Sequence, residues 1–89
     1  MPLTNATTSA VIVLGPAAVA LRDNVERFLG FVLTPGGNYP SSQLDEVEHD
    51  VGRAAVLVSV RGPRPELDRL AYTLKTTFQL EHADLDTDT

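Results

Sequence analysis

Residues 9–15 read SAVIVLG, a strand-like run that is apolar on both of its alternating faces. In a strand, the even-numbered residues would point to one side of the sheet, and Val11 and Val13 would point to the other. A strand with one face in water normally alternates apolar with polar residues. A chain of 89 residues offers few helices to cover both faces. The run therefore predicts a small sheet whose second face is covered by association.

Two segments carry apolar residues at helical spacing. The first follows the Gly15-Pro16 break and ends before the Pro/Gly turn at residues 35–37, and the second begins near Pro65. In each segment the apolar residues recur three or four positions apart, which indicates an amphipathic helix with one buried stripe. The first stripe comprises Leu21, Val25, Phe28, Leu29 and Val32, and the second comprises Leu67, Leu70, Ala71, Leu74 and Phe78.

Two further segments are candidate strands. Residues 53–61 alternate clearly, with three valines at positions 56, 58 and 60 on one face. Residues 43–51 are ambiguous, because they fit either a strand with Val47 and His49 on one face or a short helix that begins at Ser42. We favour the strand, since residues 50–53 would then form a tight hairpin turn into the next strand.

The order strand, helix, strand, strand, helix matches the ferredoxin-like split βαβ plan. The expected fold is an α+β domain over residues 9–80, with an antiparallel sheet and two helices on one face. Residues 1–8 are expected to form a flexible arm, and residues 81–89 either an acidic tail or a short fourth strand at the edge. In this plan the first and third strands are neighbours at the centre of the sheet.

The sheet face away from the helices is the predicted interface. Val11 and Val13 would lie beside Ala55 and Leu57 there, in a patch too apolar to remain in water. A second copy of the chain or another protein would cover it. Tyr39, in the loop before residue 43, is the best candidate for a lone aromatic contact.

Charge is segregated along the chain. The net charge is −5, residues 43–52 and residues 81–89 carry four acids each, and residues 53–75 carry five bases against two acids. The overall charge disfavours direct nucleic-acid binding, because phosphate would be repelled. The blocks could steer a partner or fix the register of a dimer. The predicted acidic patch comprises Asp45, Glu46, Glu48, Asp50, Asp84, Asp86 and Asp88.

No catalytic or metal-binding motif is present. The chain has no cysteine, and no nucleophile-elbow or phosphate-binding motif occurs in it. His49 and Glu48 would point to opposite faces of a strand, so we expect no chelate from that segment. We therefore expect no enzyme activity and no cofactor or metal. The absence of cysteine, of a signal peptide and of a long apolar stretch favours a cytoplasmic location without membrane contact.

These observations favour a non-catalytic interaction, assembly or regulatory module. Its partner would be a second copy of itself, in a homodimer, or another protein. One alternative is a small acidic inhibitor, such as a phage or mobile-element antagonist, that mimics nucleic-acid phosphates with its two acidic blocks. Another alternative is a regulatory domain that binds a small ligand, for which the only argument is analogy of fold.

Overall fold

The computed structural model describes residues 7–34 and 36–87, which form a small α+β domain. The α+β class expected from the sequence is confirmed, with three helices where two were predicted. The elements in chain order are β1 (Thr8–Leu14), α1 (Ala17–Ala20), α2 (Arg22–Val32), β2 (Gln43–Asp50), β3 (Ala55–Gly62), α3 (Arg64–Thr77) and β4 (Ala83–Thr87).

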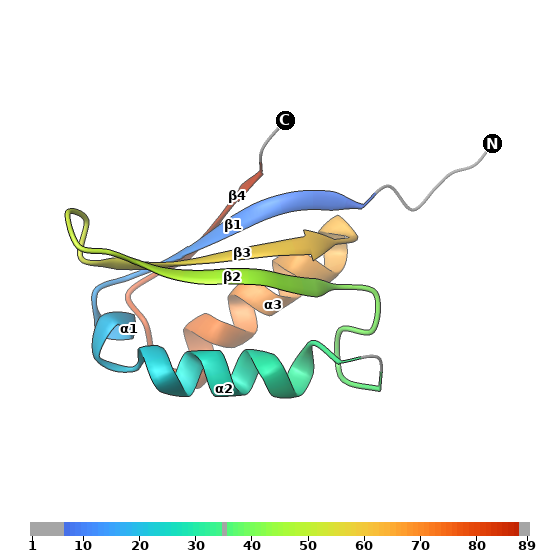
Figure 1. Ribbon diagram of the computed structural model, residues 1–89, viewed down its shortest axis with the longest axis horizontal. Coiled ribbons are helices and arrows are strands. Elements are labelled where there is room, and N and C mark those ends of the chain that lie inside the picture. Colours follow the sequence, from blue (N-terminus) through green and yellow to red (C-terminus); the bar gives the residue numbers. More distant parts are fainter. Residues whose placement is uncertain (1–6, 35, 88–89) are drawn as a thin grey trace.

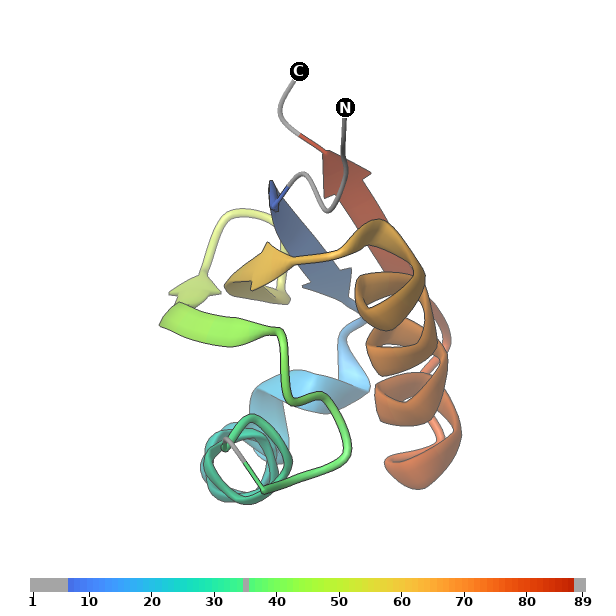
Figure 2. The same cartoon turned by 90° about the vertical axis from the view of Figure 1, so that its right-hand side faces the viewer.

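The four strands form one antiparallel sheet in the order β2-β3-β1-β4. Both ribbon views place all three helices on the same side of this sheet (Figures 1 and 2). α2 packs on β2, α1 on β3, and α3 mainly on β4 with further contacts to β1 and β3. The molecule therefore has two layers. The face that packs on the helices is called the inner face below, and the opposite one the outer face.

β1 and β3 are central neighbours, as the sequence predicted, and their register decides which side chains face the helices. Val13 is opposite Leu57 and Ile12 is opposite Val58 in this pairing. Ala10, Ile12 and Leu14 are at most 4% exposed, so these three residues of β1 belong to the core. The three valines of β3 at positions 56, 58 and 60 are equally buried beside them.

The helices cover the inner face with the two predicted stripes. Val25 and Leu29 of α2 are fully buried, and so are the three leucines of α3. Phe28 and Phe78 join the two helices edge to face, with ring centroids 5.6 Å apart. The extra helix arises because the backbone leaves the α region at Leu21, which separates the single turn α1 from α2.

Residues 43–50 form strand β2, so the strand alternative is confirmed and the helix alternative is wrong. The strand contains a bulge between Leu44 and Glu46. Leu44 and Val47 are three residues apart and would lie on opposite faces of a regular strand. The extra residue, Asp45, brings both onto the inner face, where they pack against the core. β2 ends at Asp50, one residue before the predicted end of the strand, and Val51 lies in the turn, where it is 78% exposed.

The last strand, β4, pairs with β1 at the edge of the sheet, so residues 83–87 form the edge strand that the sequence left open. The N-terminal arm predicted for residues 1–8 lies outside the described residues up to residue 6, and Thr8 already belongs to β1. Asp88 also lies outside the described residues.

Candidate functional site

The outer face of the sheet is not covered by any described element, because the three helices pack on the inner face (Figure 2). The strand register aligns its side chains in cross-strand sets of four, one residue from each strand. One set is Glu48, Leu57, Val13 and Asp84, and the next is Glu46, Ser59, Val11 and Asp86. Each set thus has an acid at both ends and an uncharged pair in the middle.

The middle of the outer face is apolar. Val11, Val13 and Leu57 are only partly buried there, in contrast to the core residues that alternate with them. These three side chains are called the apolar stripe below. Ala55, which was expected to belong to the same surface, is 4% exposed and so contributes almost nothing to it. The stripe is therefore centred on the facing pair Val13 and Leu57.

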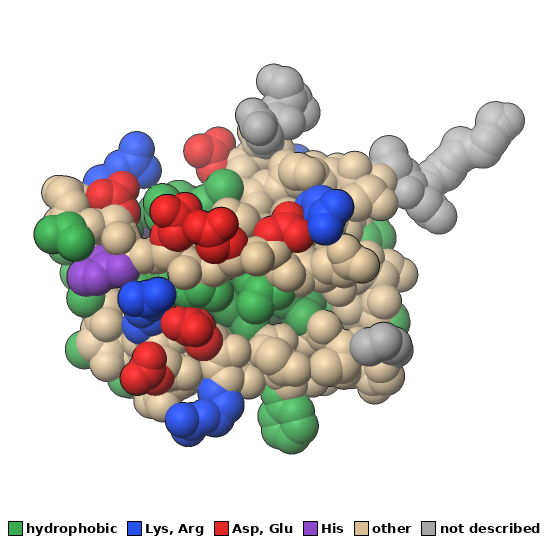
Figure 3. Space-filling view, viewed as in Figure 1, with side chains coloured by type: hydrophobic (Ala, Val, Ile, Leu, Met, Phe, Trp, Pro, Cys, Tyr) green, Lys and Arg blue, Asp and Glu red, His purple; other side chains and the backbone are tan. Residues whose placement is uncertain are grey.

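Carboxylates border the apolar stripe on both sides. On β2 the acids lie opposite the outward-facing residues of β3, and on β4 opposite those of β1. Figure 3 shows acidic side chains gathered along β2. The two acidic blocks, about 35 residues apart in the sequence, thus become two acidic rows on one face. These rows are Glu46, Glu48 and Asp50 on β2, and Asp84 and Asp86 on β4.

The basic side chains near this face, two arginines and a histidine, pair with acids at the ends of the acidic segments. Arg61 pairs with the bulge residue Asp45 at 2.9 Å, and Arg53 pairs with Asp50 at 3.5 Å. His82 Nδ1 lies 2.9 Å from Asp84. Among the described residues, no cation forms an ion pair with Glu46, Glu48 or Asp86. These three carboxylates flank the apolar stripe and leave its borders strongly negative.

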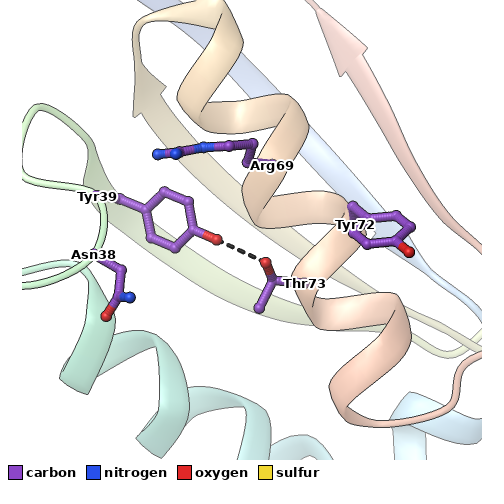
Figure 4. A pocket seen from close by; sticks show the side chains of 5 residues that line it. All are labelled: Asn38, Tyr39, Arg69, Tyr72 and Thr73. Carbon is purple, nitrogen blue, oxygen red and sulfur yellow. Dashed lines mark hydrogen bonds between the residues drawn. The ribbon is translucent and has the colours of Figure 1, made fainter.

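Tyr39, which was expected to be a contact residue, lies on the helix side of the molecule. Its side chain is 5% exposed and belongs to the core, and its hydroxyl is 2.7 Å from Oγ1 of Thr73 on α3 (Figure 4). The guanidinium of Arg69 lies over its ring, 5.3 Å from the centroid. Tyr39 thus anchors the loop before β2 on α3, which is a structural role.

A shallow hollow of about 280 Å³ opens beside Tyr39 (Figure 4). This volume is just below the range of about 300–1,000 Å³ that is usual for small-ligand sites. Asn38, Arg69 and the largely exposed Tyr72 line it together with Tyr39 and Thr73. Two of the polar groups that line it, the hydroxyls of Tyr39 and Thr73, already bond to each other.

The buried polar group of the fold is also structural. Ser42 is 5% exposed, and its hydroxyl donates to Oε1 of Glu66 at 2.8 Å, while the Ser41 N–H donates to the same atom at 3.3 Å. These bonds fasten the start of β2 to the first turn of α3. Within residues 7–34 and 36–87, no three His, Asp or Glu side chains gather as metal ligands would.

No protein-family model, curated protein or solved structure matches this chain. None of the helices in the described part of the chain has the length and apolar character needed to cross a membrane.

Sequence reasoning did not place the two acidic rows on the same face as the apolar stripe. The signal was present, because Glu46 and Glu48 alternate with Val47, and Asp84 and Asp86 alternate with Leu85. Once Val47 and Leu85 are assigned to the inner face, the acids must lie on the outer one. Sequence reasoning also missed Phe31, which is 80% exposed because it lies outside the buried stripe of α2.

Proposed function

We propose that this chain is a non-catalytic interaction module that docks another protein on its outer sheet face. The observation that carries the proposal is the apolar stripe, whose three side chains lie partly exposed at the centre of a sheet face that no described element covers. A contiguous apolar surface bordered by polar residues is typical of protein interaction sites.

We also infer that the fold is the ferredoxin-like split βαβ arrangement. From β4 to β2 the strand order is β4-β1-β3-β2, with every neighbouring pair antiparallel. The segment with α1 and α2 connects β1 to β2 across β3, and α3 connects β3 to β4 across β1. Two crossovers of this kind, both with their helices on one face, support the assignment and leave the other face open for a partner.

A partner of different sequence is favoured over a second copy. Two sheets that pack face to face usually align their strands within about 30°. In such a pair of identical outer faces, the acidic rows of one copy would lie close to those of the other. Like charges placed opposite one another are destabilising, and within the described part of the chain Glu46, Glu48 and Asp86 form no ion pair that would offset this.

An acidic inhibitor of a nucleic-acid-binding protein is the second candidate. It is supported by the two acidic rows, which extend along one face as phosphates extend along a duplex. The two candidates differ in what they require. A phosphate mimic needs the carboxylates, whereas a docking module needs the apolar stripe as well.

The proposal is tested with a photo-crosslinking amino acid incorporated in place of Val13, in cells of the native host. The control carries the same group in place of Tyr72, which is exposed on α3. We expect a discrete product with another protein from position 13, and its loss when Leu57→Glu is added. Equal products from both positions, or a product from position 13 that survives Leu57→Glu, would overturn the docking proposal.

A further inference from the structure

We propose that the partner presents a cationic amphipathic α-helix, which lies along β1 and β3 between the two acidic rows. This inference rests on the proposed function and adds the chemistry of the partner to it. The helix would place its apolar residues on Val11, Val13 and Leu57, and lysines or arginines along both sides of that apolar strip.

The width of the outer face fits one helix. Neighbouring strands are about 4.8 Å apart, so the backbones of β2 and β4, three spacings apart, are separated by about 14 Å. An α-helix with its side chains is about 10–12 Å across. A single helix on the central strands β1 and β3 therefore fills the space between the acidic rows.

The spacing along the face also matches a helix. Acids two residues apart on one strand, such as Glu46 and Glu48, are separated by about 6.8 Å along the strand. Helix residues four apart are separated by about 6 Å along the helix axis. Basic residues at this spacing on each side of the apolar strip would face Glu46 and Glu48 on one side and Asp84 and Asp86 on the other.

The charge of the outer face determines which sign of charge the partner must carry. Glu46, Glu48 and Asp86 are without an ion pair among the described residues, and the chain as a whole carries a charge of −5. A surface of this charge repels an acidic or phosphate-rich partner and attracts a basic one. The apolar stripe between the carboxylates adds the requirement that the basic partner be apolar along its centre.

The helices of this chain do not present the apolar strip that the outer face requires of its partner. The large hydrophobic side chains exposed in the described structure are Phe31 on α2, Val51 in the β2–β3 turn and Tyr72 on α3. α2 and α3 thus each offer one exposed large apolar residue rather than a strip, and the single turn α1 offers none. The helix that fits the outer face therefore belongs to a different protein.

The probe for this proposal is a synthetic 18-residue peptide of leucine and lysine, with the leucines on one helical face and lysines on both sides of them. Two comparison peptides are needed: one with the same composition in an order that gives no apolar face, and one in which leucine and lysine alternate, so that it is amphipathic as a strand. Binding is measured by fluorescence anisotropy at low and at high salt.

The protein variants separate local charge from net charge. Glu48→Gln with Asp86→Asn removes one unpaired carboxylate from each row, and Asp23→Asn with Asp68→Asn makes the same change in net charge on the helices. We expect the first variant to weaken binding of the helical peptide by roughly three- to tenfold at low salt, and the second by less than about twofold. Leu57→Glu should abolish binding.

Other results would contradict the helix proposal, the docking function or both. If the shuffled peptide binds as tightly as the helical one, or the two charge variants weaken binding equally, only net charge is being sensed and the helix proposal is wrong. If the alternating peptide binds best and Leu57→Glu abolishes its binding, the outer face docks a strand, so the helix proposal fails and the docking function stands. If no peptide responds to Leu57→Glu, the outer face does not dock a basic apolar partner, and the crosslink from position 13 decides the docking function separately.

Discussion

Val13 lies directly opposite Leu57 in the pairing of β1 with β3, and this pair is flanked by Glu48 on one edge strand and Asp84 on the other. These four residues come from four separate parts of the chain. They place two apolar side chains at the centre of the outer face and a carboxylate at each border. The stripe and its acidic borders depend on the registers of three strand pairs, and a one-residue slip in any of them would turn the side chains of the slipped strand to the other face.

If the outer face is open, adjacent residues of β3 should respond very differently to the same substitution. Leu57 is partly exposed on the outer face, whereas Val58 is 0% exposed on the inner face. We expect Leu57→Glu to change the free energy of unfolding by no more than about 1 kcal/mol. Val58→Glu, which places a charge in the core, should cost more than about 4 kcal/mol or abolish cooperative unfolding in urea. Equal destabilisation by both would show that the outer face is already covered.

The purified chain should be a monomer in low-salt buffer. The acidic rows oppose face-to-face association of identical copies, since Glu46, Glu48 and Asp86 form no ion pair in residues 7–34 and 36–87. Light scattering at two protein concentrations measures this directly. A dimer that Leu57→Glu converts to a monomer would contradict the choice of a different protein as partner.

Two glycines should respond in opposite directions to alanine. A Cβ on Gly62 would lie 2.9 Å from Cα of Ser42, where the backbone must move, and we expect Gly62→Ala to cost about 2–3 kcal/mol. Around Gly30 in α2 there is open space, so Gly30→Ala should stabilise the protein by about 0.5–1 kcal/mol. Urea unfolding of both variants tests the close approach of β3 to Ser42, and similar effects of the two would refute it.

Removing the Tyr39 hydroxyl should affect stability and leave docking unchanged. The hydroxyl bonds to Thr73 in a partly buried setting, so Tyr39→Phe is expected to cost about 1 kcal/mol in thermal or urea unfolding. Tyr72→Phe, at an exposed position nearby, serves as the control and should change nothing measurable. A loss of leucine–lysine peptide binding in Tyr39→Phe would place the docking surface on the helix side instead.

Much of this architecture could be predicted from the periodicity of apolar residues. The stripes of α2 and α3 and the alternation of β1 and β3 are confirmed, because burial on one side of a helix or strand leaves a direct trace in the sequence. The bulge at Asp45 could not be predicted from alternation, since it depends on Leu44 and Val47 both finding the core. The break at Leu21 and the burial of Tyr39 likewise depend on tertiary packing.

The candidate site was predicted only in part for the same reason. Val11, Val13 and Leu57 could be assigned to one face from β1 and β3 alone. Their acidic borders required the positions of β2 and β4, which are set by long-range pairing rather than by local sequence.

The most direct test of the docking surface is a methyl NMR titration of the ¹³C-labelled protein with the helical leucine–lysine peptide. We predict that the large shift changes are confined to the methyl groups of Val11, Val13 and Leu57, while the buried methyl groups of Val25 and Leu70 barely move. Large changes at Val51 or along α2 and α3, with those of the apolar stripe unchanged, would contradict the account.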